Sequence, residues 1–217
     1  YAHHIQCLWF SLSPGRTGRN PHGPFHSHKV AATIRQLRDL KLKIPCLDSS
    51  CDLSASDESV QSVEQIMELA HDLQVSCVVA CALQDREDMV RQNIEALLQA
   101  AEALGVRLLI KTSGIYADPA RLRKMLDSFA CDSLGALWDM HHPYRDMGES
   151  ADATIKNLGA YVCHVHLRDS DDKDTYNLIG EGTLPVADMM RALSSINYDG
   201  FISIEWKPEW MEDLQDR

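Results

Sequence analysis

Residues 86–113 read REDMVRQNIEALLQAAEALGVRLLIKTS, a helical pattern that runs directly into a strand pattern. Apolar residues recur every three or four positions over Arg86–Leu104, which predicts an amphipathic helix, and Gly105 fits its end. The apolar run Arg107–Thr112 predicts a short buried strand. A helix that leads at once into a strand is the repeating unit of parallel β/α folds.

The same alternation continues along the chain on both sides of this unit. Apolar or β-branched runs predict strands at Ile5–Phe10, Lys43–Leu47, Ser76–Ala82, Arg107–Thr112, Gly135–Asp139, Tyr161–Leu167 and Phe201–Trp206. Helical spacing of apolar residues predicts helices at His28–Leu40, Ser59–Leu73, Arg86–Leu104, Pro119–Asp127, Ala151–Leu158 and Val186–Ser195. One predicted helix lies between each pair of successive strands.

This alternation predicts one α/β domain over residues 1–217, a (β/α)8 TIM barrel. The chain contains neither GxGxxG nor GxxxxGK[ST], which disfavours the alternative, a doubly wound nucleotide-binding sheet. The chain starts almost in a strand and ends just after one. We therefore expect the barrel to lack its first βα unit and most of its last helix, as in a fragment of a longer protein. Strand edges left open in this way invite a missing segment or a second copy of the chain.

Composition narrows the class of protein. With 45% hydrophobic and 24% charged residues over 217 positions, the chain can bury the core of one globular domain. A formal charge of -11 disfavours nucleic acid as a partner. No apolar run reaches the roughly 20 residues that cross a bilayer and no secretory signal opens the chain, so we expect no membrane partner and a cytoplasmic location. The seven cysteines form no CxxC pair, which favours buried thiols over a zinc site.

Polar residues follow the apolar part of four predicted strands, where barrel enzymes carry their functional groups. These strand ends are Lys111-Thr112-Ser113, Trp138-Asp139-Met140-His141-His142-Pro143, His164-Val165-His166-Leu167-Arg168-Asp169 and Ile204-Glu205-Trp206. Asp, His and Glu side chains from neighbouring strands suit Mn²⁺, Mg²⁺, Co²⁺ or Zn²⁺ when they converge.

Three motifs in order carry a family resemblance: Leu137 to Pro143, His164 to Asp169, and Tyr198-Asp199-Gly200-Phe201 through Glu205-Trp206. Together they resemble the sugar phosphate isomerase/epimerase family of xylose isomerase-like TIM barrels. The resemblance implies a divalent metal held by Asp139, His166, Glu205 and a further Glu, with His142 contacting the substrate. It also implies a small keto-sugar or sugar acid as substrate.

Lys111 departs from this pattern, because it stands where the family carries the fourth metal ligand. A protonated lysine repels a metal ion, and beside Asp139 and Glu205 it would form direct ion pairs instead. Our first hypothesis is an isomerase or epimerase that moves a proton next to a carbonyl, with Glu205, His142 and Lys111 as catalytic residues. The electrophile is then either a divalent metal held by the three ligands Asp139, His166 and Glu205, or Lys111 itself. His166 is an alternative second acid or base.

Two other functions remain open. The barrel can be catalytically silent and serve as a ligand-binding or interaction domain. Less favoured is Schiff-base chemistry, an aldolase or dehydratase reaction through a deprotonated Lys111.

Further candidate substrate contacts lie near the same strand ends. Arg168 can clamp a phosphate or carboxylate, or can pair with Asp169 or Asp171. His164 shares a strand face with His166 and is either a site neighbour or a core residue. The remaining candidates at the rim are Trp9, His22, Glu181 and Trp206.

Overall fold

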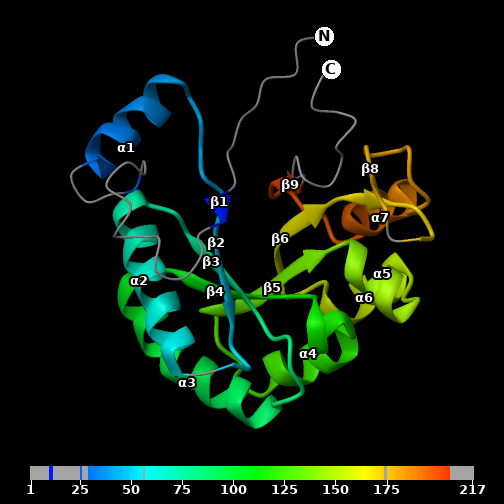
Figure 1. The fold of residues 1–217 in the computed structure, drawn as a ribbon, viewed down its shortest axis with the longest axis horizontal. Coiled ribbons are helices and arrows are strands. Elements are labelled where there is room, and N and C mark those ends of the chain that lie inside the picture. Colours follow the sequence, from blue (N-terminus) through cyan, green and yellow to red (C-terminus); the bar gives the residue numbers. More distant parts are fainter. Residues whose placement is uncertain (1–9, 12–24, 26–28, 56, 174, 206–217) are drawn as a thin grey trace.

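The computed structural model describes residues 10–11, 25, 29–55, 57–173 and 175–205 (Figure 1). Three of the candidate substrate contacts, Trp9, His22 and Trp206, lie outside the described residues.

A curled parallel sheet forms the centre of the fold. Among the described residues its seven strands follow the order β1-β2-β3-β4-β5-β6-β9, with every neighbouring pair parallel. The strands are β1 Phe10–Ser11, β2 Leu47–Asp52, β3 Cys77–Cys81, β4 Arg107–Lys111, β5 Leu134–Asp139, β6 Val162–Leu167 and β9 Ile202–Ile204. The sheet curls toward a barrel, and β1 and β9 are the outermost of the described strands (Figure 1). The (β/α)8 prediction is confirmed in this form.

Helices cover the outer side of the curled sheet (Figure 1). They are α1 Val30–Asp39, α2 Asp57–Leu73, α3 Glu87–Leu104, α4 Pro119–Asp127, α5 His141–Met147, α6 Ala151–Leu158 and α7 Val186–Ser195, with a 3-10 turn at Gly114–Ala117. A small antiparallel hairpin, β7 Asp169–Ser170 with β8 Tyr176–Asn177, follows β6.

Three helices have the predicted boundaries, and side-chain caps mark the start of two of them. The bounds of α4, α6 and α7 are those predicted. Asp118 accepts hydrogen bonds from the Ala120 and Arg121 amides at the start of α4, and the Ser150 hydroxyl accepts one from Ala153 at the start of α6.

One predicted strand is misplaced. The strand expected at Lys43–Leu47 begins only at Leu47 and continues to Asp52. Pro45 has no N–H to donate to a sheet ladder, which explains the late start. The polar sequence of β2 does not show the apolar pattern of a buried strand. Ser49 can nevertheless be fully buried, because its hydroxyl donates to the Val79 carbonyl at 2.6 Å. The short α5 and the β7–β8 hairpin were not predicted.

The largest apolar cluster lies between β2–β4 and the helices packed on them, and a second lies around β5, β6 and α7. A third, smaller cluster joins Cys46, Cys77, Val79, Leu109 and Leu137. Side chains two residues apart on a strand share a face. Lys111 and Asp139 therefore extend from the face that carries Leu109 and Leu137, at the carboxyl ends of β4 and β5.

The described cysteines are free thiols, and Cys46, Cys51 and Cys77 are buried as expected. Burial raises the pKa of the Cys81 thiol to about 12. None of the helices in the described part of the chain combines the length and apolar content that a membrane span requires. The cytoplasmic location stays a prediction.

Candidate functional site

The ends of β4 and β5 are joined by one threonine. The Thr112 hydroxyl donates to the Asp139 carbonyl at 3.1 Å and accepts from the Asp139 amide at 2.9 Å. Lys111 pairs in register with Leu137. This exchange brings the Lys111 and Asp139 side chains to the same end of neighbouring strands.

The next two strands continue this arrangement. Asp139 pairs in register with His166, and the Met140 amide donates to the His166 carbonyl at 3.0 Å. The Glu205 amide donates to the Leu167 carbonyl at 2.9 Å, which holds Glu205 just beyond β9. One ligand atom from each of Asp139, His166 and Glu205 lies within 4.8 Å of the others.

Two cations close a ring with the two carboxylates, and we call Lys111, Asp139, Arg168 and Glu205 the charge ring. The Lys111 ammonium lies 3.0 Å from Asp139 Oδ2 and 3.4 Å from Glu205 Oε2. The Arg168 guanidinium lies 3.4 Å from Asp139 Oδ2 and 3.8 Å from Glu205 Oε2. Each carboxylate therefore faces both cations. The exposed fractions of the four side chains are only 0 to 12%.

The charged forms in the ring support one another. Desolvation opposes each charge, but Lys111 and Arg168 together hold the pKa of Asp139 far below its usual range. In the same way, burial would lower the pKa of Lys111, but Asp139, Glu205 and the more distant Asp48 raise it above its ordinary value. Lys111 is therefore an ammonium and not a free amine at neutral pH.

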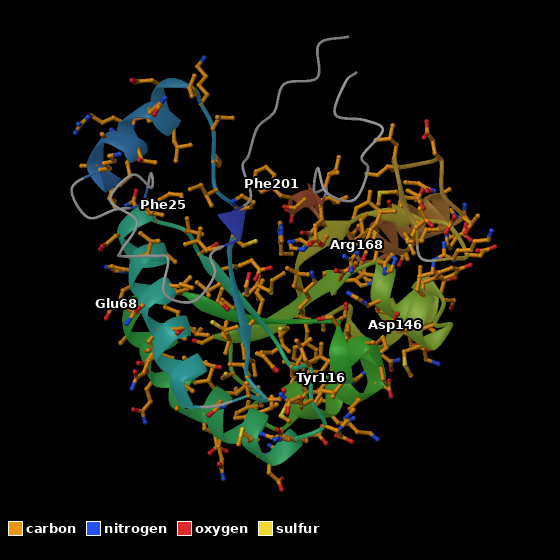
Figure 2. The ribbon with its side chains drawn as sticks, in the orientation of Figure 1. Phe25, Glu68, Tyr116, Asp146, Arg168 and Phe201 are labelled. Atoms are coloured by element: carbon orange, nitrogen blue, oxygen red, sulfur yellow. The ribbon has the colours of Figure 1, made fainter. Side chains whose placement is uncertain are left out.

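His142 is oriented by two neighbours on opposite sides of its ring. Arg168 approaches Nε2 at 2.5 Å, and Asp146, four residues along α5, accepts from Nδ1 at 2.8 Å. An arginine can only donate, so Nε2 accepts and the ring proton sits on Nδ1. Figure 2 shows Arg168 beside the end of β6 and Asp146 on the neighbouring α5. His142 Nε2 lies 3.9 Å from Asp139 Oδ2, at the border of the ring.

The residues present do not fit a divalent metal ion. Asp139, His166 and Glu205 have suitable donor atoms, but the Lys111 ammonium already lies on both carboxylates. The charges of the ring cancel, and burial with the neighbouring cations keeps the pKa of His166 well below its ordinary value, so that its ring is neutral. A divalent ion would meet a repelling ammonium and no net negative charge.

A second group of ligand atoms was missed by the sequence analysis. One atom from each of Cys46, His164 and His166 lies within 4.8 Å of the others, in the buried interior of the barrel. His164 Nε2 lies 2.8 Å from the Ser203 hydroxyl, and its ring is edge-on to His166. His164 and His166 follow Cys46 by 118 and 120 positions, a spacing that no short metal-binding motif has.

Glu181 lies in the loop between β8 and α7, where its side chain is exposed. This loop is organised by Asp169, whose carboxylate accepts from the amides of Gly180, Gly182 and Leu184. A Cβ at Gly182 would lie 2.2 Å from Asp169 Oδ1, so the motif needs glycine there. A substrate contact by Glu181 stays a prediction.

Two supporting residues, Asp146 and Tyr176, were not predicted from the sequence, and Thr112 was named at its strand end without a role. The Tyr176 ring lies 5.3 Å from the Arg168 guanidinium, and its hydroxyl accepts from Arg168 at 3.5 Å. Asp146 had a usable signal, since it follows His142 by four residues, the spacing of neighbours on a helix. Recognising it required first recognising α5.

Comparison with known proteins identifies the family. A family model described as xylose isomerase-like TIM barrel matches residues 2–216. The chain belongs to this family. Fructoselysine 3-epimerase of Escherichia coli O157:H7 is 25% identical over 128 residues, which is 56% of this chain and 46% of that protein. An uncharacterised Methanocaldococcus jannaschii protein is 27% identical over 123 residues, 53% of this chain and 42% of its own length. The chain thus spans less than half the length of these curated relatives.

Solved structures agree on the fold of the xylose isomerase-like family. A D-tagatose 3-epimerase-like protein superposes with a TM-score of 0.75 at 18% identity, covering 99% of this chain and 88% of that one. The IOLI protein, in a crystal structure with a bound zinc atom, superposes with a TM-score of 0.77 at 17% identity, covering 94% and 81%. The family resemblance predicted from the strand-end motifs is confirmed.

Proposed function

We propose that this protein rearranges a small keto-sugar or sugar acid by moving a proton on a carbon next to a carbonyl group. Its family and the epimerases among its relatives support this class of reaction. The observation that carries the proposal is the charge ring with His142 at its border, at the end of the barrel where the strands finish.

Glu205 is the proposed base. Its side chain is 8% exposed, and its Oε2 lies 3.4 Å from the Lys111 ammonium and 3.8 Å from the Arg168 guanidinium. As a carboxylate it can accept a proton from the carbon next to the substrate carbonyl. Negative charge then develops on the carbonyl oxygen, where a neighbouring cation is stabilising.

His142 is the proposed second acid or base, in preference to His166. His142 is 25% exposed and can reach a substrate, whereas His166 is fully buried. Asp146 fixes the His142 proton on Nδ1. A substrate that displaces Arg168 from Nε2 would free this nitrogen to exchange a proton with the substrate.

The test is exchange of a carbon-bound proton with solvent. Keto-sugars and hydroxy acids incubated with the protein in D₂O are followed by NMR for deuterium uptake and for new isomers. We expect Glu205→Gln to lower the exchange rate by about 10²- to 10⁴-fold. Glu95→Gln, on the exposed face of α3, makes the same chemical change and should leave the rate unaltered. Equal rates in native protein and Glu205→Gln would refute the proposed base.

A catalytically silent ligand-binding barrel is the second candidate, favoured by the closed pairing of the ring charges. Calorimetric binding of a sugar without exchange or isomerisation would support it. Schiff-base chemistry requires a neutral amine, and the carboxylates around Lys111 raise its pKa. We therefore expect borohydride to trap no keto-sugar on Lys111.

A further inference from the structure

The Lys111 ammonium lies between the two carboxylates of the ring. It lies 3.0 Å from Asp139 Oδ2 and 3.4 Å from Glu205 Oε2, two oxygens that belong to one potential metal-ligand group. Asp139 and Glu205 stand on strands that are not neighbours in the sheet, since β6 lies between them. One cation therefore bridges side chains across a strand, as a bound metal ion does.

The charge of the ring leads to the same conclusion. Two buried carboxylates need two units of positive charge, and Lys111 and Arg168 supply them from two different strand ends. Exchanging Lys111 for a carboxylate would change the local charge by two units, which is the charge of one divalent ion. The ring is thus neutral with Lys111, and with a carboxylate at this position it carries a net negative charge that attracts a divalent cation.

Lys111 also retains a donor for a ligand. An ammonium has three N–H groups, and the two carboxylates face two of them. The side chain is 12% exposed, more than that of Asp139, Arg168 or Glu205. The remaining N–H can therefore meet an oxygen atom that enters from the side on which Lys111 is exposed.

We infer that Lys111 replaces a divalent metal in this protein: its ammonium holds Asp139 and Glu205 together and donates its third N–H to the carbonyl oxygen of the substrate. The holding role stands on the ring geometry alone. The donation to a carbonyl oxygen rests on the proposed function.

Metal content tests the holding role without any assay of turnover. Each protein is stripped with chelator, dialysed and titrated with Mn²⁺, which prefers oxygen and imidazole ligands over the thiol of the Cys46 group. We expect no stoichiometric Mn²⁺ in native protein. We expect Lys111→Glu to bind one equivalent at least about 100-fold more tightly, and to melt at a higher temperature with Mn²⁺ than without it.

Two further variants keep this test decisive. Lys124→Glu, at an exposed position on α4, makes the same change in net charge and should gain no site. Lys111→Met removes the ammonium without adding a carboxylate; it should bind Mn²⁺ more weakly than Lys111→Glu but more tightly than native protein. It also covers the case in which Lys111→Glu does not fold.

Several results would overturn the inference. Stoichiometric Mn²⁺ in native protein that is lost in Asp139→Asn would show that the lysine does not exclude the ion. Failure of both Lys111 variants to gain Mn²⁺ would show that the lysine does not occupy a metal position. Where the proposed exchange reaction is found, chelator should leave the native rate unchanged, and a chelator-sensitive rate would contradict the inference. Absence of any exchange reaction would refute the proposed function while leaving the Mn²⁺ result intact.

Discussion

Two regions of the molecule are buried but built from opposite chemistry. One is the apolar packing of β2–β4 against helices α2 and α3, and the other is the charge ring at the strand ends. Ile66, Ile94 and Leu97 in the former are at most 1% exposed, and Asp139 in the latter is fully buried. Each apolar side chain there contributes by leaving water, largely independently of distant ones. Each charge in the ring pays a desolvation cost that only its partners offset. A buried apolar side chain therefore stabilises the protein on its own, whereas a buried charge in the ring does so only together with its partners.

Removing one ring member should have the largest effect on stability. Asp139→Ala leaves Lys111 and Arg168 each without one of their carboxylate partners and should lower the free energy of unfolding by about 3 to 5 kcal/mol. Urea denaturation monitored by circular dichroism measures this. Asp188→Ala, which breaks an exposed ion pair on α7, is the matched control. A loss below about 1 kcal/mol for Asp139→Ala would show that the ring charges are not mutually dependent.

Truncating a side chain in the apolar region should cost slightly less. Leu97→Ala on α3 removes a fully buried side chain from the largest apolar cluster and should lower the free energy of unfolding by about 3 kcal/mol. The same denaturation experiment at low and high salt separates the two regions. The cost of Leu97→Ala should not depend on the screening of charges, and a marked salt dependence would contradict the comparison.

Lowering the pH should reduce the stability that the buried histidines next to the ring contribute, whereas the apolar region has no comparable dependence on pH. Burial lowers the pKa of His164 to about 4, so its ring is neutral in the folded protein, while the unfolded chain takes up a proton below about pH 6.5. This contribution to stability is complete above pH 6.5 and is lost as the pH falls toward 4. From pH 7 to pH 5 it amounts to about 2 kcal/mol.

His164→Gln tests that contribution, because glutamine can still hydrogen-bond Ser203 but does not titrate. Its free energy of unfolding should fall less than that of native protein between pH 7 and pH 5. His141, with a pKa lowered to about 4, and His166 contribute to the loss that remains. Identical pH profiles for the two proteins would mean that His164 does not titrate as its burial requires.

The smallest effect is expected for an ion pair at the surface. Arg191 pairs with Asp188 on α7, with side chains 73% and 56% exposed. Arg191→Ala should change the free energy of unfolding by less than about 0.5 kcal/mol. Thermal melting at several salt concentrations checks this value. A loss comparable to that of Asp139→Ala would mean that burial is not what distinguishes the two ion pairs.

Local signals predicted much of this fold. Capping residues with helical periodicity predicted the observed bounds of α4 and α6, and periodicity predicted those of α7. Apolar runs located both ends of each strand from β3 to β6 within one residue. The strand β2 was misplaced because its buried face carries Ser49 where an apolar side chain would be expected. The Ser49 hydroxyl is hydrogen-bonded to a main-chain carbonyl, which allows it to be buried. The seven-residue α5 is too short for periodicity to detect.

The sequence by itself determined the α/β alternation, the family, and the strand ends at which Lys111, Asp139, His166 and Glu205 stand. These depend on short-range patterns and on the order of motifs along the chain. The family resemblance also led us to expect the Lys111 ammonium to pair with Glu205, 94 residues away, as the structure shows. Only the tertiary structure decided that Arg168 completes the ring and that Asp146 sets the His142 proton. The charge state of a buried group depends on which distant charges lie within a few ångströms of it, and no spacing in the sequence carries that distance.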